Sequence, residues 1–250
     1  MYRSFGSLVA TVTSPPETRQ GSGRGFRCAE SWPPMLHGVD NPYAGNRRGR
    51  QSREEILDVA SRVMAERGYS ATTMSVLSAE TGLPKSAIYH HFHSKGGLLS
   101  AVMERGAYEF FQHMKQSQAD PPDDLSPAEL IGWFLQRTGE VFLAKPDFLR
   151  LHLILLMSTE SVSDVAVGDI LQRVRQDGRQ HMRWMIAQSW ASLGPEVADR
   201  VGRSLDYFGI AGFDGAFVAW QADPERSMSA QMALLAEAMV AIADRVIAEG

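Results

Sequence analysis

Apolar residues recur every three or four positions through most of this chain, a spacing typical of amphipathic helices. The first such stretch extends from about Ser52 to Arg67. Its apolar face consists of Ile56, Ala60, Val63 and Met64. Ser52 and Glu55 fit a capping box at its start, and Gly68 is placed to end it. Because no convincing alternation of apolar and polar residues indicates a strand, the pattern predicts an all-α protein.

Three further helices follow, separated by residues that interrupt helices. Thr72 or Thr73 can cap a helix that ends near position 81, and Gly82 supplies the turn after it. Pro84 suits the first position of the next helix, and Ser94 opens another. The buried stripe of that last helix is predicted to be Leu98, Leu99, Val102 and Met103.

Longer helices are predicted beyond position 122. Their approximate ranges are Pro127–Ala144, Asp147–Met157, Val165–Leu193, Pro195–Gln221 and Met228–Ala248. The final helix carries a heptad seam at Met228, Met232, Leu235, Met239, Ile242 and Val246. A second apolar line on another face consists of Leu234, Ala238 and Ala241. We therefore expect one face to pack on the chain's own core and the other on a partner.

The first 46 residues lack this periodicity. They contain two Pro-Pro pairs with scattered Gly and Ser, and such a stretch cannot bury enough apolar surface to offset its ordering entropy. We expect residues 1–46 to form a disordered tail, and an over-called start codon is the alternative interpretation.

Composition narrows the range of function classes. The hydrophobic fraction of 44% is ordinary for a soluble globular chain. Apolar runs such as Leu153 to Met157 are far shorter than the roughly 20 residues that span a bilayer, so we expect no membrane segment. Cys28 is the only cysteine, which excludes an intramolecular disulfide and a thiolate metal cluster. A reducing cytoplasm is the expected location.

Charge is distributed unevenly along the chain. Residues 47–105 contain nine Lys or Arg and six Asp or Glu. Residues 106–250 contain twelve Lys or Arg and twenty Asp or Glu. A mildly basic segment beside an acidic one suggests a polyanion as partner of the first segment, and a solvated charged face is the alternative.

The most informative stretch extends from Thr73 to Leu98. Two short helices joined by a turn around Gly82 form a helix-turn-helix, whose second helix offers its outer face to the major groove of DNA. The side chains expected to pack inward are Val76, Leu77, Leu83, Ile88 and Phe92.

This stretch resembles the TetR family of bacterial transcription regulators over about Arg53 to Glu104. The matching positions are Thr73, Leu77, Gly82, Leu83, Lys85, Ala87, Ile88, Tyr89, His90, Phe92, Lys95 and Leu98. The remainder is similar in helical layout only. The sequence departs from the family's pattern at Ser78 and Thr81, where alanine is usual, at Pro84, where serine is usual, and at Gly96-Gly97.

The resemblance implies a two-domain, homodimeric DNA-binding regulator. The DNA-binding domain would cover 50–110, with the motif at about 73–92, and an effector-binding and dimerisation domain would cover 111–250. Recognition helices at about Pro84–Phe92 would enter successive major grooves of a near-palindromic double-stranded operator. A small apolar effector would release this repressor from DNA. The alternatives are a DNA-binding regulator or activator without a ligand, and a helical small-molecule carrier or enzyme.

Several side chains are candidates for contacts with DNA. Lys85, near the start of the recognition helix, can donate to guanine, and Ser86 is the next candidate for base reading. Ile88 and Phe92 already supply the inward stripe, so Tyr89 should point outward. The further candidates for phosphate contacts are Thr73, Tyr89, His90, Lys95, Arg50 and Arg53. Thr73 also fits a helix cap. The arm with Arg50 and Arg53 also fits a minor-groove contact or a solubilising linker.

No metal, cofactor or catalytic site is predicted. His90, His91 and His93 cannot easily converge on one ion, and no cysteine or carboxylate stands close in sequence to complete a ligand set. The sequence has no glycine-rich phosphate loop and no nucleophile elbow, so we do not expect an enzyme.

The C-terminal half is rich in aromatic residues, most of which must be core. A ligand pocket is expected to combine large side chains with a few polar groups. The candidates for its lining are Trp133, Arg137, His152, Trp184 and Phe213. The residues expected at a dimer interface formed by the last two helices are Val201, Leu205, Phe208, Gly212, Leu235 and Met239.

Overall fold

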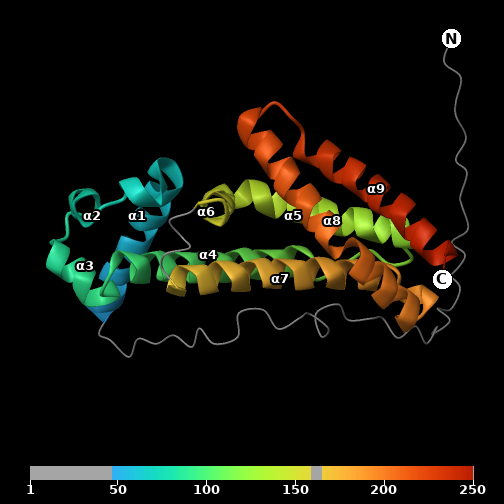
Figure 1. The fold of residues 1–250 in the computed structure, drawn as a ribbon, viewed down its shortest axis with the longest axis horizontal. Helices are drawn as coiled ribbons and strands as arrows, with labels where there is room; N and C mark the ends of the chain where they lie inside the picture. The colour runs from blue at the N-terminus through green and yellow to red at the C-terminus, as the bar shows by residue number, and fades with distance from the viewer. Residues whose placement is uncertain (1–46, 159–164, 250) are drawn as a thin grey trace, which may run out of the picture.

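The computed structural model describes residues 47–158 and 165–249 (Figure 1). Within these ranges the regular elements are all helical, which confirms the predicted all-α class. The elements are α1 (Arg47–Ala71), α2 (Met74–Thr81), α3 (Lys85–Phe92), α4 (Lys95–Ser117), α5 (Pro127–Ala144), α6 (Pro146–Leu156), α7 (Val165–Ser189), the short 3-10 helix η2 (Ala191–Leu193), α8 (Pro195–Ala222) and α9 (Met228–Ala248). The expectation of a disordered tail at 1–46 lies outside the described residues.

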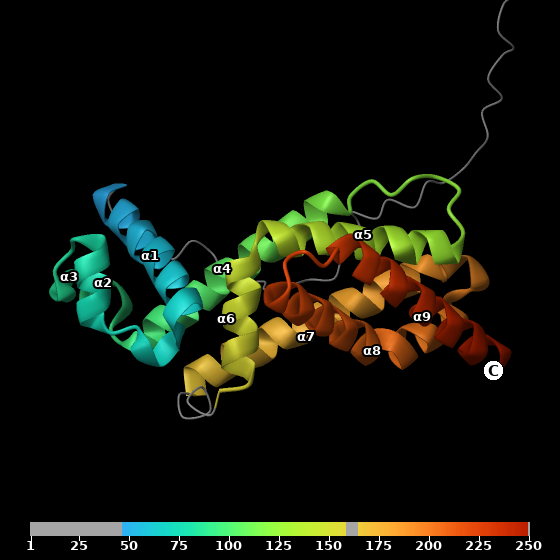
Figure 2. The ribbon, with the colours of Figure 1, turned by 90° about the horizontal axis from the view of Figure 1, so that it is seen from above.

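The helices form an N-terminal group and a longer C-terminal bundle. Figures 1 and 2 show α1, α2 and α3 gathered at one end of the molecule, with α4 extending from them along α7. The bundle consists of α5, α7, α8 and α9, which pack pairwise, while α6 lies against α1 and α4. Helix α4 therefore belongs to both groups and connects them mechanically.

The predicted helix boundaries are correct to within a few residues, with specific exceptions. Ser52 lies inside α1, so the capping box predicted there is wrong. Gly68 breaks the regular path of α1 as expected, because its φ of 80° is in the left-handed region. Pro84 is the N-cap of α3, one position before the place predicted for it. Helix α7 ends at Ser189, and the predicted continuation is the separate turn η2.

Hydroxyl side chains begin several of these helices. Thr73 caps α2 through a bond from the Val76 backbone N–H, and Ser94 caps α4 in the same way through Gly97. Ser126 and Glu129 form a reciprocal capping box at the start of α5. These caps satisfy backbone N–H groups at the starts of α2, α4 and α5 and so define where these helices begin.

Gly97 fits a close approach between α3 and the first turn of α4. A Cβ atom at this position would collide with the backbone carbonyl oxygen of Phe92, which cannot move without disturbing the end of α3. The departure from the family's pattern at this position therefore has a steric reason.

We expect Gly97→Ala to lower the free energy of unfolding by about 1–3 kcal/mol, because the added methyl group overpacks this contact. Denaturant unfolding measures the change. Gly132→Ala is the matched control, since its nearest neighbour would be the Ala236 Cβ at 3.9 Å. That variant should be neutral or slightly stabilised, and equal stability of both variants would contradict the steric account.

Candidate DNA-binding surface and ligand cavity

The α2–turn–α3 unit is held together by a small apolar core. Leu77 and Ile88 are fully buried, and Phe92 is buried beside them. Gly82 ends α2 with a φ of 68°, a left-handed conformation that glycine adopts without strain. Pro84 has extended backbone angles, and α3 begins directly after it at Lys85. The two short helices therefore form the predicted helix-turn-helix.

Two hydroxyls that sequence reasoning treated only as departures fix the turn. Ser78 Oγ donates to the carbonyl oxygen of Leu83 at 2.7 Å, and Thr81 Oγ1 accepts from the Leu83 backbone N–H at 3.2 Å. Pro84 provides no side-chain cap for α3. Ser78 and Thr81 instead hold Leu83 from both sides, so this chain stabilises the entry to α3 from the preceding helix.

The outer face of α3 is open to solvent. Lys85, Ser86 and His90 are exposed, and the Tyr89 side chain is 48% exposed, as its predicted outward direction requires. Thr73, at the head of α2, is also exposed while its hydroxyl caps the helix. These predicted contact residues of the motif are therefore all accessible, and Figure 1 shows α2 and α3, which carry them, at the end of the molecule opposite the bundle.

Three basic residues near this surface differ in how they are held. Arg50 is exposed, whereas the Arg53 guanidinium lies 5.2 Å from the centre of the Phe92 ring and its side chain is mostly buried. Lys95 Nζ donates to the carbonyl oxygen of Ser70 at 3.2 Å and lies 4.1 Å from the centre of the Tyr69 ring. Arg53 and Lys95 therefore also have structural contacts, which sequence spacing does not reveal.

Other arginines of α1 serve to attach α2. Arg62 and Arg67 each bond Glu80 at 3.0 Å, and the hydrogen bonds from Arg62 and then Arg67 lower the pKa of the Glu80 carboxyl. These pairs position α2 on α1. The described residues contain no group of three or more His, Cys, Asp or Glu side chains arranged to hold a metal ion.

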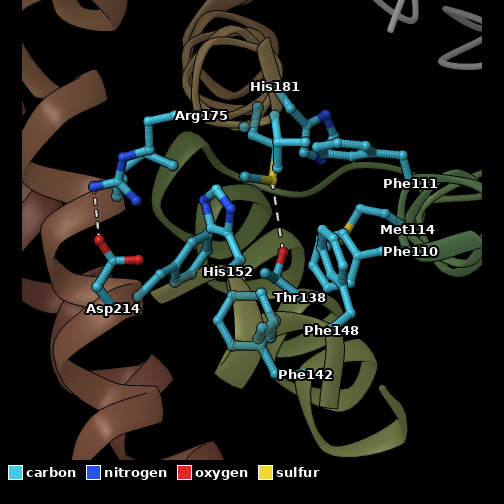
Figure 3. Close-up of a pocket in the computed structure, with 16 residues that line it drawn as sticks. Phe110, Phe111, Met114, Thr138, Phe142, Phe148, His152, Arg175, His181 and Asp214 are labelled. Atoms are coloured by element: carbon cyan, nitrogen blue, oxygen red, sulfur yellow. Dashed lines mark hydrogen bonds and ion pairs between the residues drawn. The ribbon is translucent and has the colours of Figure 1, made fainter. Parts of the chain in front are cut away.

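A cavity of about 70 Å³ lies among α4, α5, α6, α7 and α8 (Figure 3). Its aromatic lining consists of Phe110, Phe111, Phe142, Phe148 and Phe213. Its polar lining consists of Thr138, His152, Arg175, His181 and Asp214. Since ligand pockets usually enclose roughly 300–1,000 Å³, a ligand of ordinary size must displace lining side chains as it enters.

Two of the predicted pocket residues, His152 and Phe213, line this cavity. Trp184 does not line it but stacks on His181, with 5.4 Å between ring centres. Trp133 and Arg137 lie against each other on α5, where Arg137 also pairs with Glu140 at 2.8 Å. Of the five residues predicted for the pocket, two line the cavity, and Trp133, Arg137 and Trp184 pack elsewhere.

A buried polar network under the cavity links three helices. Gln118, at the end of α4, donates to the carbonyl oxygen of Phe134 and to Thr138 Oγ1. Its Oε1 lies 2.9 Å from His181 Nε2. The side-chain amide thus joins α4 to α5 and α7, although nothing in the sequence pattern singles out Gln118.

Burial keeps the cavity histidines neutral. It lowers the pKa of His152 to about 4, with a smaller contribution from the positive charge of Arg175. It lowers the pKa of His181 to about 3. In the unfolded chain both groups titrate near 6.5, so acidification below that pH protonates the unfolded state first and favours it.

We therefore expect the free energy of unfolding to fall between pH 7 and pH 5. Each of the two histidines should contribute roughly 2 kcal/mol at pH 5. Denaturant titrations at several pH values measure this change. His152→Phe should reduce the dependence of the free energy of unfolding on pH. If the stability of the wild-type protein is the same at pH 7 and pH 5, the two histidines are not held neutral by burial.

Most of the residues predicted for a dimer interface lie inside the subunit. Val201, Leu205 and Met239 are fully inaccessible and Leu235 is buried. A Cβ atom at Gly212 would collide with Leu235, so this glycine lets α8 approach α9 of the same chain. The heptad seam of α9 thus packs on α5 and α8, and of the six predicted residues only Phe208 is exposed.

A different apolar stripe of α8 and α9 is exposed. Leu234, from the second apolar line of α9, is 60% exposed, and Val218 of α8 is 56% exposed. Phe208, Ala211 and Gly215 follow the same face of α8 as Val218 at helical spacing. None of the helices in the described ranges combines the length and the apolar character that a membrane span requires.

Comparison with known proteins places the N-terminal helices in a family. Residues 56–102 match the family described as bacterial regulatory proteins, tetR family. The HTH-type transcriptional regulator LmrA of Bacillus subtilis is 32% identical over 154 residues, which cover 61% of this chain and 74% of that protein. The chain spans about half the length of other curated relatives, such as 53% of the regulator YxaF of the same organism, which is 31% identical and covers 47% of this chain.

Solved structures of regulators have the same fold at low sequence identity. SmeT in complex with triclosan is 21% identical, with a TM-score of 0.55 over 77% of this chain and 91% of that chain. FadR of Bacillus subtilis in complex with stearoyl-CoA is 14% identical, with a TM-score of 0.59 over 75% of this chain and 97% of that chain. The helix-turn-helix, the C-terminal helical domain and the match to LmrA together show that this chain belongs to the TetR family of bacterial DNA-binding transcription regulators.

Proposed function

We propose that the protein is a homodimeric repressor that binds a near-palindromic double-stranded operator and leaves it when a small apolar effector binds. The observation that carries this proposal is the open outer face of α3, where Lys85, Ser86, Tyr89 and His90 are accessible on a rigid helix-turn-helix. In this proposal residues 50–110 bind DNA, whereas residues 111–250 bind the effector and dimerise.

Base reading and phosphate binding fall to different side chains. Lys85 and Ser86 occupy the first turn of α3, the part of a recognition helix that reaches base edges. Tyr89, His90, Thr73 and Arg50 are exposed, and in this proposal they contact the flanking phosphates. Lys95, whose Nζ donates to the carbonyl oxygen of Ser70, is a further candidate for a phosphate contact in this proposal.

The exposed stripe of α8 and α9 is the proposed dimer surface. A two-fold interface uses the same patch of both subunits, so each apolar residue of the patch is buried in two copies, one from each subunit. Phe208, Val218 and Leu234 supply the apolar surface, while Gly215 and Ala241 allow two helices to approach closely. This arrangement replaces the heptad seam as the interface expected from the sequence.

Ligand control is supported by the position of Phe148 between the cavity and α4. A Cβ atom on Gly106 of α4 would lie only 2.6 Å from the Phe148 ring, so the ring packs directly on the α4 backbone. A ligand that displaces Phe148 therefore changes the packing of the helix that leads to α3. SmeT and FadR, which have the same fold, have been solved in complex with triclosan and with stearoyl-CoA.

Operator binding in the presence of small apolar compounds tests the proposal. Compounds that bind should be identified by fluorescence, since Trp184 stacks on the cavity residue His181. The affinity for the operator is then measured by anisotropy with each compound. The proposal predicts that at least one cavity ligand weakens operator binding, because a ligand shifts the equilibrium only by its unequal affinity for the two states. If every bound compound leaves operator affinity unchanged, control by a protein partner replaces ligand control.

A further inference from the structure

We propose that the cavity selects an uncharged aromatic compound that carries one hydroxyl group, and that this hydroxyl hydrogen-bonds the imidazole of His152. The inference rests on the proposed function only in identifying the cavity as the effector site. It specifies the chemistry of the ligand, and its evidence lies in the cavity wall.

His152 is a polar group of the cavity wall whose imidazole can take a hydrogen bond from a ligand. Its side chain is buried, with 5% of the residue exposed, and its Nδ1 atom has no hydrogen-bond partner. A buried polar atom in this condition costs roughly 1–3 kcal/mol relative to a bonded one. Figure 3 places the imidazole in the midst of the lining side chains, so a ligand that enters the cavity can supply the missing bond.

Other polar side chains of the wall are already engaged. The Thr138 hydroxyl donates to the carbonyl oxygen of Phe134 and accepts from Gln118 Nε2. Arg175 and Asp214 form an ion pair at 2.6 Å, which Figure 3 shows at one side of the cavity. Because these two charges balance each other, a charged ligand would enter an apolar space without a counter-ion of its own.

The neutral state of His152 favours a hydroxyl over a charged group. Burial holds its pKa near 4, so the imidazole is uncharged at neutral pH and offers one donor and one acceptor nitrogen. A hydroxyl can donate or accept and therefore matches Nδ1 in either tautomer. A carboxylate can only accept, and an ammonium group can only donate while losing its hydration.

The surrounding rings favour an aromatic body for the ligand. Phe148 stacks on His152 with an interplanar angle of 17°, and Phe110 lies 5.4 Å from Phe148 between ring centres. Phe142 in turn packs edge-on against Phe213 at 5.3 Å. A flat ring can slide between such side chains with small rotations, and it retains the offset and edge contacts that aromatic groups prefer.

Calorimetry with two isosteric probes, in the absence of DNA, tests the inference. The probes are 4-ethylphenol and 4-ethyltoluene, which differ by a hydroxyl in place of a methyl group. For each protein, the affinity for 4-ethylphenol is divided by the affinity for 4-ethyltoluene. This ratio should be about tenfold higher in the wild-type protein than in His152→Phe. Phenylalanine keeps the ring that stacks on Phe148 but removes both nitrogens. Phe213→Leu is the control, because it should weaken both probes and preserve their ratio.

The outcomes are distinct. An unchanged ratio in His152→Phe, tighter binding of 4-ethylbenzoate than of 4-ethylphenol, or no binding of either probe would overturn the inference. Thermal unfolding of both variants shows whether they remain folded, and His152→Gln, which restores a polar partner, should recover part of the preference for the phenol. A His152-dependent preference without any effect on operator affinity would support the inference and contradict ligand release.

Discussion

Replacing Leu234 by glutamate should convert the protein into a monomer and lower its operator affinity by about 100-fold or more. Leu234 is 60% exposed on α9, and α9 packs against α8, on which Val218 and Phe208 are also exposed. In a two-fold dimer both copies of the glutamate would be buried in the same apolar interface without a counter-ion. Loss of the dimer lowers the affinity for the operator, because the single recognition helix of a monomer reads only one half-site.

Size-exclusion chromatography with light scattering measures the mass of this variant. Leu143→Glu is the matched control, because Leu143 is also an exposed leucine but belongs to α5, which is not part of the proposed surface. The control should remain dimeric. A dimeric Leu234→Glu variant would contradict the proposed surface. Charged substitutions at Leu235 or Met239 would test folding instead, because both side chains are buried inside the subunit.

Lys85→Ala should lower affinity for the cognate operator by about 1–3 kcal/mol and relax the preference at one base position. Lys85 is exposed in the first turn of α3, where a side chain can donate to guanine O6 and N7. Titrations on cognate and scrambled duplexes separate the two effects. Lys115→Ala, at an exposed site near the far end of α4, is the control and should change neither.

Phosphate contacts should behave differently in the same titrations. Lys95→Ala should weaken all sequences about equally and reduce the salt slope by about one unit. Its thermal stability must be measured too, because Lys95 also bonds Ser70. Tyr89→Phe should cost about 1 kcal/mol, the value of one neutral hydrogen bond. If Lys85→Ala lowers cognate and scrambled affinities by the same factor, base reading belongs to another residue, with Ser86 next.

The helical layout could be predicted because helix periodicity, glycine turns and hydroxyl caps are local signals. Gly82 and Ser94 end and begin helices where the pattern places them. The exposed face of α3 followed from the same logic, since Ile88 and Phe92 fill the inner side. The roles of Ser78 and Thr81 were not predictable in this way, because their partner Leu83 becomes available only in the folded turn.

The errors concern which surface an apolar face meets. The seam of α9 has the spacing of a helix interface, but the spacing is the same whether the partner helix belongs to the same subunit or to another. Here Leu235 and Met239 pack within the subunit, whereas Leu234 remains exposed. In the same way, aromatic richness could not distinguish Trp133, which packs on Phe134, from Phe213, which lines the cavity.

Selection of binding sites from a randomised library of DNA duplexes by the intact protein tests the central claim most directly. The account predicts enrichment of a near-palindromic sequence whose half-sites are separated by about one helical turn or a multiple of it, since two α3 helices would read successive major grooves. Lys85→Ala should enrich a motif with one degenerate position in each half-site. Enrichment of no motif, or of a motif without two-fold symmetry, would contradict the proposal of a homodimeric operator-binding regulator.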